Sequence, residues 1–74
     1  MSAGRMIAVA RTATGLSLDD LAASTRLRAS ILSAMEADDF SVCGGDVYVR
    51  GHLRAIAPIL GIDADALVLA FERT

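Results

Sequence analysis

The sequence has no lysine, asparagine, glutamine or tryptophan, and it has only one cysteine, one proline and three aromatic residues. Asparagine and glutamine are the side chains that bind adenine through two hydrogen bonds, so their absence argues against sequence-specific DNA recognition. The single cysteine, Cys43, excludes an internal disulfide and fits a reducing cytosol. Because 54% of the residues are hydrophobic and few are aromatic, we expect an aliphatic core.

Long hydrophobic runs are also missing. The longest extend from Met6 to Ala10 and from Ala66 to Phe71, far short of the roughly 20 residues that a membrane-spanning helix needs. One arginine and a short apolar patch at the N-terminus do not make a secretory signal. We therefore expect a single cytoplasmic domain over residues 1–74, associated with a membrane only through a segment outside this chain.

The charge balance is slightly acidic. All seven basic residues are arginine, and the formal net charge is −2. Proteins that bind the phosphate backbone of duplex DNA usually carry an excess of basic residues, because phosphate neutralisation supplies most of their affinity. The overall charge therefore leans against nucleic acid, although a local arginine cluster is still compatible with it.

Catalytic patterns are lacking as well. The chain shows no paired carboxylates, no glycine-rich phosphate loop and no nucleophile with a neighbouring base. His52 is the only histidine, and Cys43 lies in another segment, so no metal-ligand spacing exists. We expect a non-enzymatic protein with no catalytic residue, metal or cofactor.

Apolar spacing predicts five helices, over residues 3–13, 18–24, 29–37, 47–60 and 64–73. Ser17 with Asp20 forms a weak capping box, Asp46 and Asp63 are expected N-caps, and Gly15 and Gly61 end helices. Pro58 is expected to kink the fourth helix. The positions predicted to face inward are Ala3, Ile7, Ala10, Leu18, Leu21, Ala22, Leu32, Met35, Val49, Leu53, Ile56, Leu60, Leu67, Ala70 and Phe71.

Residues 21–36 have the spacing of a helix-turn-helix. The small Ala22 lets two helices cross closely, Leu27 fills the turn, and Leu32 packs the second helix on the first. Arg26 occupies the turn position where glycine is common, so a positive φ there implies modest strain.

Over almost its whole length the sequence resembles the N-terminal cytoplasmic domain of RodZ-type bacterial cell-shape proteins. The resemblance implies an all-α, five-helix, lambda-repressor-like fold, which is a DNA-binding-domain fold containing a helix-turn-helix. The matching strings are Ala10-Arg11, Gly15-Leu16-Ser17-Leu18, Leu21-Ala22, Thr25-Arg26-Leu27-Arg28, Asp39-Phe40, Val47-Tyr48-Val49-Arg50-Gly51, Leu53-Arg54-Ala55 and Leu60-Gly61-Ile62-Asp63.

The same resemblance implies a partner. Domains of this family dock onto the actin-like filament protein MreB through the fourth-helix region, and they usually precede a basic segment and one transmembrane helix. The family places two aromatics four residues apart around the Val-Arg-Gly string. Here these positions are Tyr48 and His52, and the second departs from the usual tyrosine. Cys43-Gly44 also replaces a typical Leu-Pro pair, and Pro58 is unusual for the family.

The residues themselves support a docking surface on the fourth helix. Tyr48 and His52 lie one turn apart and are followed on the same stripe by Ile59. Arg50 and Arg54 flank them, and tyrosine and arginine are enriched in interface hot spots. The alternative is that Tyr48 folds over the preceding loop and Ile59 packs on the fifth helix, which leaves His52 merely exposed.

DNA binding is the second hypothesis. The start of the second helix of the motif would contact bases, and there only Arg28 is able to bind guanine through two hydrogen bonds. Arg26 joins Arg28 in this candidate set, while Ser30 and Ser33 discriminate poorly between bases. Phosphates are expected to be contacted by Arg5, Arg11, Arg26, Arg50 and Arg54 if they share a face. Otherwise the motif is a packing unit, and its arginines are solvated or paired with aspartates.

Two smaller expectations concern the ends of helices. The acids Glu36, Asp38 and Asp39 gather at the C-terminal end of the third helix, where they oppose the helix dipole and repel phosphate. The run from Ala66 to Phe71 has more apolar residues than one core face needs. Val68 or Leu69 is therefore expected to be exposed, as a dimer contact or a lead into a downstream region.

Overall fold

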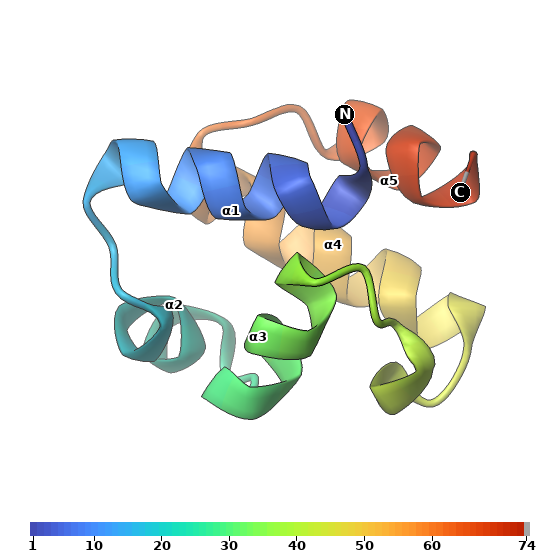
Figure 1. The fold of residues 1–74 in the computed structure, drawn as a ribbon, viewed down its shortest axis with the longest axis horizontal. Coiled ribbons are helices and arrows are strands. Elements are labelled where there is room, and N and C mark those ends of the chain that lie inside the picture. Colours follow the sequence, from blue (N-terminus) through green and yellow to red (C-terminus); the bar gives the residue numbers. More distant parts are fainter. Residues whose placement is uncertain (74) are drawn as a thin grey trace.

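The computed structural model describes residues 1–73. Within them the chain forms α1 (Ala3–Thr14), α2 (Leu18–Thr25), α3 (Ala29–Glu36), the short 3₁₀ helix η1 (Ser41–Cys43), α4 (Asp46–Leu60) and α5 (Ala64–Glu72). Figure 1 shows these elements packed into one body. The all-α fold class with five α-helices and a helix-turn-helix is confirmed.

The central element is α4, the longest helix, which contacts α1, α2, α5 and η1. Figure 1 shows α1 and α5 along one long edge of the molecule, with α2, α3 and η1 along the other. The helices α1 and α5 run antiparallel, so the start of α1 and the end of α5 lie at the same end of the body. The α2–α3 pair forms the helix-turn-helix, and both of its helices face the interior through single apolar stripes.

The core is aliphatic, as predicted. Every residue expected to face inward is either buried or half-buried against the core. Cys43, Ala57 and Val68 join the core without having been predicted there. The two phenylalanines, Phe40 and Phe71, close its edge with ring centroids 5.0 Å apart in a T-shaped contact.

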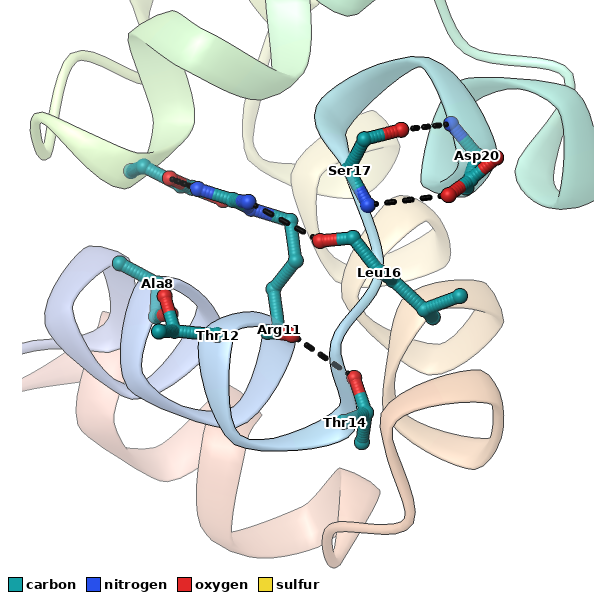
Figure 2. A network of polar contacts seen from close by, with 8 residues as sticks. Ala8, Arg11, Thr12, Thr14, Leu16, Ser17 and Asp20 are labelled. Atoms are coloured by element: carbon teal, nitrogen blue, oxygen red, sulfur yellow. Dashed lines mark hydrogen bonds and ion pairs between the residues drawn. The ribbon is translucent and has the colours of Figure 1, made fainter.

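Most helix ends follow the predicted capping residues. Figure 2 shows the capping box at α2, where the Ser17 Oγ accepts from the Asp20 N–H at 3.0 Å and Asp20 accepts from the Ser17 N–H at 3.1 Å. Asp63 accepts from the Asp65 N–H at 3.0 Å and begins α5. Gly15 and Gly61 end α1 and α4 in the left-handed conformation that glycine adopts without strain.

The predicted cap of α4 is wrong by one residue. The helix begins at Asp46, its N-cap is Gly45, and no side chain caps it. Gly45 has a φ of 134°, which a residue with a side chain rarely adopts. Because the chain turns at Gly45, Asp46 is already the first residue of the helix. Pro58 lies inside α4, which continues to Leu60; the expected kink stays a prediction.

The acids at the C-terminal end of α3 have structural partners that their sequence position did not suggest. The Glu36 carboxylate binds Arg11 of α1 through two hydrogen bonds, of 2.7 and 3.1 Å. Asp38 accepts from the Gly4 N–H at the start of α1, and Asp39 accepts from the Ser41 N–H. Two of the three acids therefore tie α3 to α1.

Candidate functional site

The exposed part of α4 begins at its first turn. Its core stripe, which includes Val49 and Leu53, sets the rotation of the helix and turns Tyr48 outward. The side chain of Tyr48 is 63% exposed and lies beside Gly44, near the position where a Cβ of that glycine would be. Tyr48 therefore stands free at the corner between the Gly44-Gly45 turn and α4.

The five residues predicted for docking fall on two flanks of α4. Successive residues of an α-helix are about 100° apart, so Tyr48 and His52 are about 40° apart while Tyr48 and Arg50 are about 160° apart. Tyr48, His52 and Ile59 share one flank. Arg50 and Arg54 lie on the other flank, which faces α5.

The arginine flank is engaged by acids of α5. The Arg50 Nε lies 3.3 Å from the Glu72 Oε2, and the Arg54 Nη1 lies 3.1 Å from the Asp65 Oδ1. Both pairs are solvent-exposed, so each contributes little to stability. Arg50 also lines an open hollow together with Phe40, Asp46, Phe71 and Glu72. Sequence spacing did not predict this hollow, because only the tertiary pairing of α4 with α5 creates it.

The tyrosine flank becomes less exposed along its length. His52 is half-buried, and Ile59 is half-buried and packs against the core. Of the three side chains, Tyr48 thus offers by far the freest surface. The packing of Ile59 against the core agrees with the alternative for that residue. Tyr48 does lie beside Gly44 of the preceding loop, as the alternative expects, yet it remains 63% exposed.

The turn of the helix-turn-helix presents two further arginines. Arg26 has a φ of 61°, so the positive φ considered from the sequence is present. Arg26 and Arg28 are both exposed, and within residues 1–73 neither forms an ion pair. Ser30 and Ser33 are exposed on α3. The solvent side of α3 consequently offers small side chains next to two free cations.

The arginines considered for phosphate do not all remain available. Figure 2 shows Arg11 donating from Nη1 to the Leu16 carbonyl at 3.1 Å. The paired Glu36 carboxylate also raises the pKa of the Arg11 guanidinium. Since Arg50 and Arg54 are paired with α5 as well, only Arg5 and Arg26 of that set lack a carboxylate partner among the described residues.

Other chemistry finds little support in the described part of the chain. No three His, Cys, Asp or Glu side chains lie close enough together to hold a metal ion. Burial, together with the negative charge of Asp39, raises the pKa of the Cys43 thiol.

No helix within residues 1–73 combines the length and the apolar character needed to cross a membrane.

Comparison with known proteins agrees with this geometry. Residues 6–67 match the family described as a helix-turn-helix domain, which covers α2, α3 and α4 together. The chain belongs to this helix-turn-helix family. Together with the two relatives described next, this match confirms the resemblance to the helix-turn-helix domain of RodZ-type proteins.

Two curated relatives are similar to the chain. It is 35% identical over 69 residues to the cytoskeleton protein RodZ of Streptococcus pneumoniae, covering 93% of this chain and 25% of that protein. It is 38% identical over 52 residues to the uncharacterized membrane protein YmfM of Bacillus subtilis, covering 70% of this chain and 18% of that protein. The chain therefore spans about a quarter or less of the curated relatives it matches. No solved structure matches it.

Proposed function

We propose that this helix-turn-helix domain is a non-enzymatic cytoplasmic adaptor that docks a protein partner through the Tyr48 flank of α4. The observation that carries the proposal is the 63% exposure of Tyr48. Among the exposed apolar and aromatic residues of the described chain, Tyr48 has the bulkiest side chain. A free tyrosine beside a glycine turn offers a rigid anchor that a partner pocket can bury. His52 extends the same flank by one turn.

The partner that fits the resemblance is an actin-like cell-shape filament of the MreB type. The similarity to a protein named cytoskeleton protein RodZ supports this choice. In this proposal the chain forms one domain over residues 1–74, at the inner face of the cell membrane in a longer protein. The name of the second relative, a membrane protein, supports that location.

Filament co-sedimentation tests the docking surface. The chain is mixed with polymerised MreB, and the bound fraction is measured for wild type, Tyr48→Ala and Val47→Ala. Val47 is 77% exposed and lies about 100° from Tyr48 around the same turn, so it is a matched control. Removing an interface anchor costs about 2 kcal/mol or more, which corresponds to roughly 30-fold weaker binding for Tyr48→Ala. Equal pelleting of wild type and Tyr48→Ala would remove the assignment.

DNA binding is the second candidate, because Arg26 and Arg28 are exposed and free of ion pairs among the described residues. To test this, the affinity for a DNA duplex is measured by titration at low salt for wild type and Arg28→Ala. Arg54→Ala serves as the control because Arg54 is already paired with Asp65. Affinity that falls with salt and is lost only in Arg28→Ala would favour DNA over protein docking. No measurable duplex binding would leave docking alone.

A further inference from the structure

The outer surfaces of α1 and α5 carry exposed apolar side chains that no element of the domain covers. Met1 is 79% exposed, Leu69 is 47% exposed and Val9 is 44% exposed. Leu69 and Met1 line a shallow hollow with Ala66 and Arg73. Val9 lines a second hollow on α1 with Arg5. We call this surface the α1/α5 outer face, defined by Met1, Arg5, Val9, Ala66, Leu69 and Arg73.

The α1/α5 outer face is positively charged in a chain whose net charge is −2. Neither hollow is lined by an acidic residue, and α1 contains none. The acids of α5, Asp65 and Glu72, are each paired with an arginine of α4. Within residues 1–73, Arg5 and Arg73 have no carboxylate partner.

The pattern of charge and apolar groups indicates what covers this face. Arginines interleaved with exposed aliphatic side chains suit an interface of anionic headgroups above acyl chains, where cations meet phosphates and apolar groups enter shallowly. A second copy using the same face would bring its free arginines toward those of the first. A nucleic acid would use the arginines but would leave Met1, Val9 and Leu69 in water.

We infer that the α1/α5 outer face rests on an anionic lipid surface. Figure 1 shows α1 and α5 along the edge of the molecule opposite η1, while Tyr48 follows η1 in the first turn of α4. A membrane on one edge therefore leaves the docking flank open. The inference does not depend on the identity of the protein partner.

Vesicle co-sedimentation tests it with vesicles of phosphatidylglycerol and phosphatidylcholine, and with phosphatidylcholine alone. Wild type is expected to bind the anionic vesicles at low salt, to dissociate from them as the salt concentration rises, and not to bind the neutral vesicles. Each arginine near such a surface contributes about fivefold in affinity, so Arg5→Gln with Arg73→Gln is expected to reduce binding on the order of 20-fold. Leu69→Ser is expected to weaken it as well.

The matched control is Arg26→Gln with Arg28→Gln, which removes two free arginines from the helix-turn-helix and changes the net charge equally. Retained vesicle binding in this control supports the α1/α5 outer face. Equal loss in both double variants overturns the inference, because the attraction would then follow total charge. Absence of wild-type binding to anionic vesicles overturns it too. So does a dimer, seen by sedimentation equilibrium, that Leu69→Ser dissociates while vesicle binding is unchanged.

Discussion

Asp38 holds the first turn of α1, because its Oδ1 accepts a hydrogen bond from the Gly4 N–H at 2.9 Å across 34 residues of sequence. The N-terminus of α1 thus meets the C-terminus of α3, where their opposite partial charges attract. A Cβ on Gly4 would collide with the Met35 carbonyl oxygen and lie 2.8 Å from that of Glu36. Only glycine fits this approach.

Gly4→Ala is expected to lower the free energy of unfolding by about 1–3 kcal/mol, because backbone carbonyls cannot yield as a flexible side chain would. Urea denaturation followed by circular dichroism measures it. Gly51→Ala is the control, since Gly51 is helical and its Cβ would meet no atom within 4 Å. The control is expected to gain up to about 1 kcal/mol from helix propensity. A loss in both variants would show that helical glycine itself, not the α1–α3 approach, governs the result.

Arg26 and Asp38 have the same backbone conformation, but replacing each with glycine is expected to change the stability in opposite directions. Their φ values are 61° and 62°, in the left-handed region that favours glycine. Arg26→Gly is expected to stabilise the fold by roughly 0.5–1 kcal/mol, since relief of strain exceeds the entropy cost of glycine. Asp38→Gly is expected to destabilise it by about 1 kcal/mol, because the bond to the Gly4 N–H is lost. Thermal denaturation compares the two variants. A stabilised Asp38→Gly would contradict the capping role of Asp38, and a destabilised Arg26→Gly would contradict the strain at Arg26.

The Arg11–Glu36 pair is expected to contribute more than the Arg50–Glu72 pair. Side chains of the first pair are 20% and 13% exposed, and those of the second are 39% and 45% exposed. Glu36→Gln is expected to reduce the free energy of unfolding by about 1–2 kcal/mol, because it weakens a partly buried charge-assisted contact. Glu72→Gln is expected to change it by less than about 0.5 kcal/mol. Denaturant midpoints measure both, and equal midpoints would refute the ranking.

The free energy of unfolding is expected to fall as the pH is lowered, because Asp20 and Asp39 become protonated. Hydrogen bonds from Ser17 lower the pKa of Asp20, and those from Ser41 lower the pKa of Asp39. Each folded-state pKa lies below the unfolded value of about 3.9, so the unfolded chain takes up protons first. Their stabilisation is complete above about pH 4 and is lost as the pH falls through the folded-state pKa values.

Carboxyl titration by NMR measures these two groups directly. Ser17→Ala is expected to return the pKa of Asp20 toward its ordinary value and to leave that of Asp39 unchanged. Ser41→Ala is expected to do the reverse, so each variant is the control for the other. An unchanged Asp20 titration in Ser17→Ala would show that the capping box does not cause the lowered pKa.

Local patterns were sufficient to predict the helices and their inward faces. The Ser17 capping box, the Gly15 and Gly61 termini and the α4 core stripe depend on neighbours within a few residues, where spacing and backbone preference decide the conformation. The start of α4 was placed one residue late, because an aspartate before an apolar run looks like a cap until the φ of Gly45 is known.

The candidate site was predicted less completely. Tyr48 and His52 were placed on one stripe from their spacing alone. The separation of Arg50 and Arg54 onto the α5 flank was not predicted, since it requires knowing that α5 packs beside α4 and presents Glu72 and Asp65 there. Their pairing leaves Tyr48 as the free element of the surface.

Local sequence patterns are enough to specify the all-α class and the helix-turn-helix, because periodicity and caps act over one or two turns, and the matching strings carry the resemblance to the family. Tertiary structure alone decided which charges are free. Ion pairs such as Arg11–Glu36 join residues 25 positions apart, and no local pattern specifies which distant helices meet. It likewise decided that Gly4 must be glycine, since the carbonyls that exclude a side chain belong to another helix.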